Sequence, residues 1–174
     1  MDAPDQHDHP AAVEPETLLA DVDEERRKAS GPGGQHRNKV ETGVRLRHRP
    51  TGLTAEAAER RSQKQNRDEA LRRLRLKLAL ETRSELALDA FVPSALWARR
   101  TGGGSLSVAG RHADVPALLA EALDVLAAAG DDPSAAARAL GVSTSRFLRV
   151  LRLEASVLEA LNRRRRARGE RPYT

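Results

Sequence analysis

The residues best suited to chemistry in this sequence form one short run, Gly31-Pro32-Gly33-Gly34-Gln35. Adjacent glycines permit positive φ angles and let the backbone come closer to another large molecule than residues with side chains could. The amide of Gln35 offers hydrogen-bond donors and an acceptor but does not titrate near neutral pH, so it can orient a water molecule and cannot deprotonate it. The run therefore suits hydrolysis of an ester that is already activated, where placing the water supplies the acceleration.

The spacing of this run disfavours other uses of a glycine-rich loop. It has neither the G-x-x-x-x-G-K-[ST] spacing of a P-loop nor the G-x-G-x-x-G spacing of a dinucleotide-binding fold. The ordinary alternative for Gln35 is an inert amide in an exposed loop. The sequence has no cysteine, which excludes a thiol nucleophile and a Cys-ligated zinc site. We expect no metal ion and no cofactor.

Charge is distributed unevenly along the chain. Residues 1–25 contain nine Asp or Glu and no Lys or Arg, whereas residues 26–80 contain sixteen Lys or Arg and five Asp or Glu. A cationic segment of this density indicates a polyanionic partner, and a solvated basic helix face is the alternative. Aromatic residues make up 2% of the chain. This scarcity disfavours stacking of successive single-stranded bases and favours contact with folded RNA or its backbone.

The elements that must position the glycine run follow from local periodicity. Asp21–Ser30 leads into the run and is predicted as a strand, with a helix as the alternative. Beyond the run, Val44, Leu46 and His48 alternate with arginines, the period of two that is typical of a half-buried strand. The turn Pro50-Thr51-Gly52 follows, and the alternation then resumes. These signals predict a β-hairpin.

A helix is predicted from Gln63 to about Thr82. Ser62 and Gln65 have the spacing of a capping box, in which the two side chains satisfy free backbone N–H groups at the helix start. The apolar stripe of this helix is expected to be buried and consists of Ala70, Leu71, Leu74 and Leu78. The other faces carry the cationic residues Lys64, Arg67, Arg72, Arg73, Arg75 and Lys77.

The second half of the sequence predicts helices only. One helix is expected from Val115 to Ala129, with Gly130 placed to end it. Two short helices on either side of Gly141–Ser145 have a helix-turn-helix pattern, and a last helix runs from about Glu154 into Arg163–Arg166.

The predicted fold class is therefore α+β, in four segments. Residues 1–14 are a disordered acidic N-terminus. Residues 15–82 form a small mixed catalytic domain with a β-hairpin and a packing helix. Residues 83–112 are a linker. Residues 113–174 form an all-α helix-turn-helix-like unit with a basic C-terminal tail.

Three runs of residues, in this order, resemble the catalytic domain of the class I peptide chain release factors. They are SGPGGQHRNK at Ser30–Lys39, RLRHRPTGL at Arg45–Leu53, and Arg61-Ser62-Gln63 with Asn66-Arg67 and Ala70-Leu71. The resemblance covers roughly Ala20 to Leu80. It implies a hydrolase that acts on the ribosome and cleaves the ester of peptidyl-tRNA.

The resemblance also implies roles for individual residues. Gly33, Gly34 and Gln35 would enter the peptidyl transferase centre of the large ribosomal subunit. There the Gln35 backbone N–H would stabilise developing charge, and its side chain would select water as the nucleophile. N-methylation of Gln35 by a glutamine methyltransferase is implied as well. Contacts with RNA are expected for Arg37, Asn38, Lys39, Arg61, Ser62, Gln63 and Arg67; a plain capping role is the alternative for Ser62 and Asn38.

The sequence shows no resemblance to a stop-codon-reading domain, so we expect stop-codon-independent release on stalled ribosomes, as in the small rescue factors. Their basic tail enters the vacant messenger channel. The matching candidates here are Arg163, Arg164, Arg165 and Arg166, for which a solvated helix end is the alternative. Two other functions stay open: a codon-dependent termination factor, and a non-catalytic RNA- or DNA-binding module that uses Arg146, Arg149 and Arg152.

The expected partners are the ribosome, peptidyl-tRNA and the glutamine methyltransferase. We expect a monomer. We also expect it in the cytoplasm, because the acidic N-terminus is the opposite of a targeting segment. No membrane partner is expected, since the sequence has no run of eighteen apolar residues.

Overall fold

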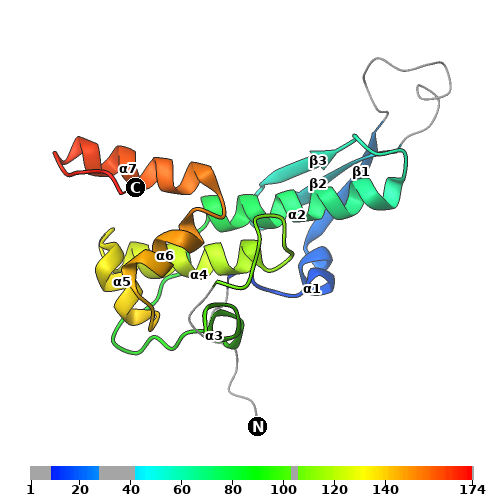
Figure 1. The fold of residues 1–174 in the computed structure, drawn as a ribbon. Helices are drawn as coiled ribbons and strands as arrows, with labels where there is room; N and C mark the ends of the chain where they lie inside the picture. Colours follow the sequence, from blue (N-terminus) through cyan, green and yellow to red (C-terminus); the bar gives the residue numbers. More distant parts are fainter. Residues whose placement is uncertain (1–8, 28–41, 103–105, 174) are drawn as a thin grey trace, which may run out of the picture. The chain divides into compact units, whose positions relative to one another are not determined.

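The computed structural model describes residues 9–27, 42–102 and 106–173. The chain divides into two compact units, which we call the α/β unit (Val13–Leu78) and the helical unit (Met1–Ala12 with Ala79–Thr174). The predicted fold class, a small α+β domain followed by helices, is confirmed (Figure 1).

The α/β unit contains a three-stranded antiparallel sheet in the order β1-β2-β3. The predicted hairpin is confirmed: Gly52 has a φ of 71° at the turn, and its N–H donates to the His48 carbonyl at 2.8 Å. His48 is buried, and this burial lowers its pKa. Val44 and Leu46 are fully buried on the same face of the central strand. The strands are β1 (Val22–Arg27), β2 (Gly43–His48) and β3 (Thr54–Ala57).

The edge strand β1 confirms the predicted strand before the glycine run, although five of its six residues are charged. Its main chain supplies the pairing, from Val22 opposite His48 to Arg27 opposite Gly43. Glu24 lies opposite the buried Leu46, and its carboxylate accepts a hydrogen bond from Arg67 at 2.7 Å. Because edge strands tolerate charge and one carboxylate has a cationic partner, this polar sequence still forms a strand.

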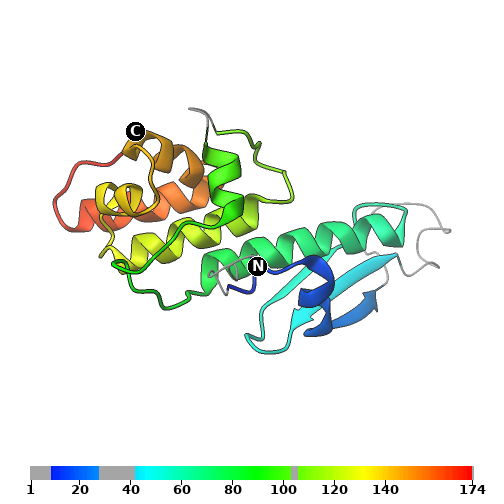
Figure 2. The same ribbon diagram turned by 90° about the horizontal axis from the view of Figure 1, so that it is seen from below.

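Helix α2 (Gln63–Glu81) lies along one face of the sheet (Figure 2). The predicted stripe is buried at Ala70, Leu74 and Leu78, which are fully inaccessible, while Leu71 is half-buried. The short helix α1 (Pro15–Ala20) precedes β1.

The helical unit is organised around one helix that is buried on every side. All residues of α4 from Val115 to Leu126 are buried, which is typical of a central core helix. The short helices α5 and α6 pack against it (Figure 1). The five helices are α3 (Ala95–Thr101), α4 (Val115–Ala128), α5 (Pro133–Ala139), α6 (Thr144–Leu151) and α7 (Ala155–Ala167).

Residues 83–112, predicted as a linker, contain helix α3. Ser94 caps this helix by accepting from the Trp97 N–H at 3.0 Å, and its own hydroxyl donates to the buried carboxylate of Glu121 at 2.6 Å. Trp97 is 1% exposed and donates its indole N–H to the Leu140 carbonyl at 3.1 Å. These contacts make part of the predicted linker a component of the helical core.

The helix-turn-helix pattern corresponds to α5 and α6. Gly141 adopts a φ of 67° in the turn, and Ser143 accepts from the Arg146 N–H at the start of α6. The guanidinium of Arg146 donates to the Thr101 carbonyl at 3.1 Å and is half-buried. Arg146 is therefore used in packing, whereas Arg149 and Arg152 are exposed.

The chain after α7 folds back against that helix. Asn162 and Tyr173 exchange two hydrogen bonds, with the side-chain amide donating to the Tyr173 carbonyl at 2.9 Å and its oxygen accepting from the Tyr173 N–H at 2.7 Å. Arg165 lies over the Tyr173 ring at 4.0 Å and pairs with Glu170 at 2.8 Å. Arg165 thus holds the end of the chain.

At the other end, residues His9–Ala12 contribute to the helical unit. His9 is fully buried; its Nδ1 accepts from the Ala11 N–H at 3.0 Å, and its Nε2 is 2.9 Å from the Thr82 hydroxyl. The rest of the predicted disordered N-terminus, residues 1–8, lies outside the described residues.

Candidate functional site

The predicted catalytic residues Gly33, Gly34 and Gln35 lie outside the described residues, as do Arg37, Asn38 and Lys39. The structure describes the frame on both sides of them. Arg27 ends β1, Gly43 begins β2, and these two residues are opposite each other in the antiparallel register. The predicted catalytic run therefore connects two neighbouring strand ends at one end of the sheet.

Gly43 lies at a point where three chain segments meet closely. A Cβ atom added to this residue would be 2.9 Å from the Arg27 carbonyl oxygen and 3.3 Å from the Ala58 Cβ. Real Cβ atoms essentially never come within 3.0 Å of a backbone oxygen. Glycine therefore allows β1, β2 and the connection after β3 to converge here.

A buried asparagine on α2 connects the same segments. Asn66 is fully buried, and its Nδ2 donates to the Thr42 carbonyl at 2.7 Å and to the Arg60 carbonyl at 2.9 Å. Its Oδ1 accepts from the Arg60 N–H at 2.9 Å. One side chain thus fixes both Thr42, which precedes β2, and the backbone of the connection between β3 and α2.

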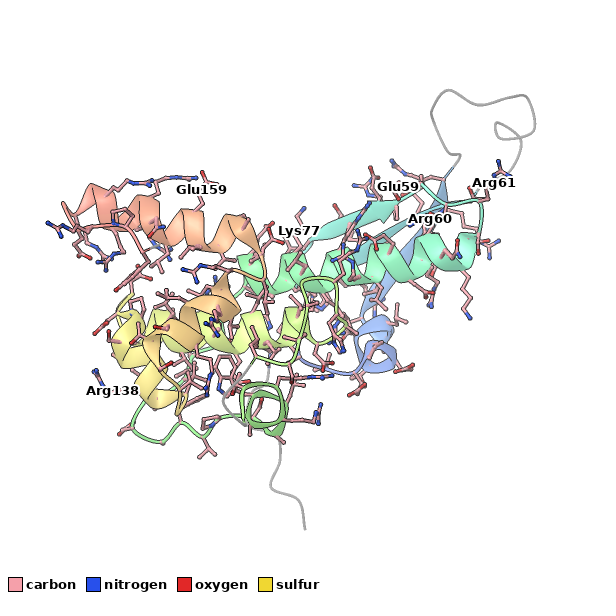
Figure 3. All side chains as sticks on the ribbon, viewed as in Figure 1. Glu59, Arg60, Arg61, Lys77, Arg138 and Glu159 are labelled. Carbon is pink, nitrogen blue, oxygen red and sulfur yellow. The ribbon has the colours of Figure 1, made fainter. Side chains whose placement is uncertain are left out.

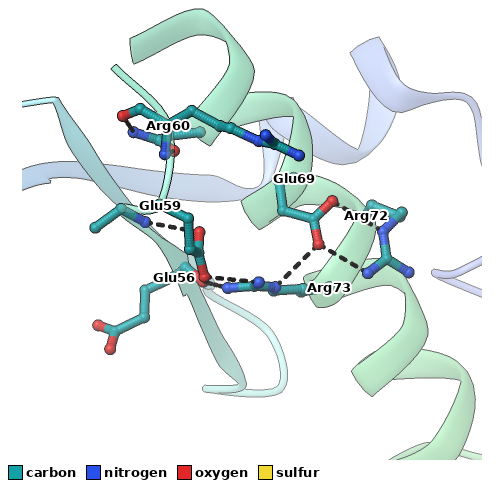
Figure 4. Close-up of polar contacts among 8 residues, drawn as sticks. Glu56, Glu59, Arg60, Glu69, Arg72 and Arg73 are labelled. Atoms are coloured by element: carbon teal, nitrogen blue, oxygen red, sulfur yellow. Dashed lines mark hydrogen bonds and ion pairs between the residues drawn. The ribbon is translucent and has the colours of Figure 1, made fainter. Parts of the chain in front are cut away.

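The connection between β3 and α2 is also held by a cluster of ion pairs (Figure 4). Arg73 donates to the Glu56 carbonyl at 2.7 Å and pairs with Glu59 at 2.8 Å and Glu69 at 3.2 Å. The hydrogen bond from Arg73 lowers the pKa of the Glu59 carboxyl. Arg72 also pairs with Glu69, at 2.8 Å. Two arginines predicted on the cationic surface of α2 therefore have carboxylate partners.

The structure brings together three predicted RNA-contacting residues at the start of α2. Arg61 is exposed, and within the described part of the chain its guanidinium has no hydrogen-bond or ion-pair partner. Figure 3 shows Arg60 and Arg61 beside the first turn of this helix. Ser62 accepts from the Gln65 N–H at 3.4 Å, as half of the predicted capping box, and Gln63 is half-buried. Ser62 and Gln63 are uncharged, so Arg61 supplies the charge at this point of the described chain.

The remaining predicted RNA-contacting residues have different surroundings. Arg67 forms the ion pair with Glu24 described above. On α7, Arg164 pairs with Asp131 at 3.2 Å and Arg165 holds the chain end, whereas Arg163 has only a 3.7 Å pair with Glu159. Among described residues, Arg166 has no partner for its exposed guanidinium.

Asn66 is not among the predicted site residues, although its position in the sequence carries a usable signal. Asn66 is one helical repeat before Ala70, which begins the buried stripe of α2, so a polar side chain was to be expected on the buried face of the helix. A buried amide must have hydrogen-bond partners. The sequence could not show which backbone groups those partners are.

The described residues offer neither a metal site nor a membrane-spanning helix. These residues contain no group of three or more His, Cys, Asp or Glu side chains arranged to hold a metal ion. In the same ranges, none of the helices has the length and apolar character needed to cross a membrane.

Comparison with known proteins identifies the segment that contains this frame. Residues 13–91 match the family model of the RF-1 domain. The chain is 43% identical over 76 residues to peptide chain release factor 1 of Symbiobacterium thermophilum, a match that covers 44% of this chain and 20% of the relative. It is 48% identical over 66 residues to peptide chain release factor 2 of Phenylobacterium zucineum, covering 38% of this chain and 18% of the relative.

Each match covers only part of this chain and part of the relative, since the chain spans about a fifth of the length of these relatives. The residues matched by the RF-1 family model include the glycine run, the three described strands and the whole of α2. Residues 13–91 of this chain are therefore similar to the RF-1 domain, and the matched segment makes up less than half of the 174 residues.

Proposed function

We propose that this chain hydrolyses the ester of peptidyl-tRNA on the ribosome. One observation supports the proposal above all: the RF-1 match includes Gly33-Gly34-Gln35, in a segment that joins two paired strand ends. In the proposed reaction the Gln35 backbone N–H stabilises the developing negative charge, and its side-chain amide orients the attacking water. Because glutamine does not titrate, the bound water is positioned and is not deprotonated by this residue. We also propose Gln35 as a substrate of a glutamine methyltransferase.

We further propose that release does not require a stop codon. The RF-1 match ends at residue 91, and the described residues after it form helices with exposed arginines. A surface of this kind fits the phosphodiester backbone of RNA whatever its sequence.

A release assay with the full-length chain tests both statements. Ribosomes carrying labelled peptidyl-tRNA are prepared on a message truncated at the P site, on a message with a stop codon in the decoding site, and on a message with a sense codon there. We expect fast release on the truncated message and no acceleration by the stop codon. Release only with a stop codon would indicate a termination factor instead. Tight binding of RNA without any release would indicate a binding module.

Two arginines of the helical unit are proposed to contact RNA because they share one groove and also lack protein partners. Arg152 and Arg166 line one open groove on the surface of α7. Both are exposed, and within the described part of the chain neither guanidinium has a partner. Cations without carboxylate partners are available to replace counterions on phosphates.

Replacing both Arg152 and Arg166 by glutamine should therefore weaken ribosome binding. We expect the half-saturating factor concentration to rise and the slope of log affinity against log salt to fall by about two, one for each lost phosphate contact. The saturating release rate should stay unchanged. The control replaces Arg99 and Arg138, which are also exposed arginines of this unit. Equal effects in both double variants would reduce the role of Arg152 and Arg166 to net charge.

A further inference from the structure

We propose that Asn66 is a positioning residue of the release reaction, because its buried amide sets where residue 42 lies relative to the start of α2. This inference rests on the proposed function, since residues 28–41 contain Gln35. Asn66 and Thr42 are 24 residues apart in the sequence. The role of Asn66 concerns the described frame and not the reacting atoms.

The hydrogen bonds of Asn66 take over where the sheet ends. The ladder between β2 and β3 finishes at the Val44–Ala57 pair. Beyond that pair the two chains are joined through Asn66, which donates to both the Thr42 and Arg60 carbonyls. Its amide therefore supplies a connection that the backbone ladder no longer provides.

The hydrogen bonds at this position use both the donors and the acceptor of an amide. Both Nδ2 hydrogens and one lone pair of Oδ1 are used, so a carboxylate would lose the donors and an aliphatic side chain would lose all three bonds. The Asn66 N–H itself donates to the Ser62 carbonyl at 3.1 Å, which fixes the backbone from which the side chain extends. Since the side chain is fully buried, water cannot replace the lost partners.

Other contacts hold β2 and the connection between β3 and α2 in place on either side of Asn66. Gly43 brings the Arg27 carbonyl and Ala58 within contact distance of β2. Arg73 holds the connection after β3 through the Glu56 carbonyl and the Glu59 carboxylate. Asn66 is the contact that couples this fixed connection to Thr42. Loss of the coupling should shift Thr42, the first described residue after the glycine run, relative to the start of α2.

The test compares Asn66→Asp and Asn66→Leu with two control variants in the full-length chain. Gln65→Glu makes the same amide-to-carboxylate change at an exposed neighbour. Leu78→Ala truncates a fully buried side chain of the same helix, 12 residues after Asn66, and should lower the melting temperature. Release is measured on truncated-message ribosomes at a temperature at which circular dichroism shows each variant to be folded.

We expect both Asn66 variants to lower the saturating release rate by about ten- to a hundredfold, as misplacement of a reacting group does. The half-saturating concentration should change by less than about threefold, because misplacement acts on the reaction and not on binding. Gln65→Glu and Leu78→Ala should keep the saturating rate. Amide hydrogen exchange at Arg60 should accelerate in Asn66→Leu, since Asn66 Oδ1 is the acceptor for this N–H.

Folded Asn66 variants that release at the wild-type saturating rate would overturn the inference. It would equally be overturned if their loss of rate matched that of Leu78→Ala at equal melting temperature, because stability alone would then explain it. Absence of release by the wild-type chain would instead refute the proposed function, and with it any positioning role in release. Arg60 exchange would then still show whether the Asn66 hydrogen bonds exist.

Discussion

Replacing Gln35 by alanine should lower the saturating rate of peptide release by about 10²- to 10³-fold, the range for removing one preorganised hydrogen-bonding group from a reaction centre. The substitution removes the amide that orients water and keeps the backbone N–H. The residual rate should therefore stay above that of ribosomes without factor. Single-turnover release of labelled peptide from truncated-message ribosomes measures the effect.

The half-saturating concentration of Gln35→Ala should be close to that of the wild type, because the amide is proposed to act during the reaction and not in binding. Gln65→Ala is the matched control: it removes the same atoms from an exposed glutamine on α2. We expect its release rate to equal the wild-type rate. Gln35→Ala release at an undiminished rate would refute the proposed role of this residue.

The elements that frame Gln35 could be predicted from the sequence because their signals are local. The alternation of Val44 and Leu46 with arginines, and the glycine at position 52, specify a strand and a turn within ten residues. The helix that follows has its own apolar stripe, and it ends one residue from the predicted position at Thr82. Each of these signals is read from neighbouring residues alone.

Contacts between distant residues could not be predicted in the same way. Arg73 is cationic in the sequence, but the fold pairs it with Glu59, which is 14 residues earlier, so part of the predicted basic surface is neutralised. Charge counted along the chain does not record such pairing. The hydrogen bonds of Asn66 to Thr42 are equally non-local, and only the buried position of the asparagine was open to prediction.

Helix α3, which lies within the predicted linker, also depends on distant contacts. It is only seven residues long, and triple glycine follows directly after Thr101. Isolated helices of this length are unstable in water, so tertiary contacts must supply the stability. Trp97 makes those contacts with the α5–α6 turn, 43 residues away. No local pattern contains that information.

Trp97→Ala should consequently destabilise the helical unit by about 3–5 kcal/mol, the usual cost of truncating a buried aromatic side chain. Trp97 is 1% exposed, and its indole N–H is bonded to the Leu140 carbonyl. Urea denaturation followed by far-UV circular dichroism measures the loss. Val92→Ala is the control: Val92 is 64% exposed, and its truncation should change the free energy of unfolding by less than about 0.5 kcal/mol.

Trp97→Phe separates the two contributions of this side chain. Phenylalanine keeps most of the buried ring but cannot donate to Leu140, so the remaining loss should be about 1–3 kcal/mol, the cost of leaving a buried carbonyl without its partner. Because Leu140 is the C-cap residue of α5, amide hydrogen exchange should accelerate first in the α5–α6 turn. If Trp97→Ala unfolded at the wild-type urea concentration, α3 would contribute nothing to the core, and the prediction of residues 83–112 as a linker would be the better description.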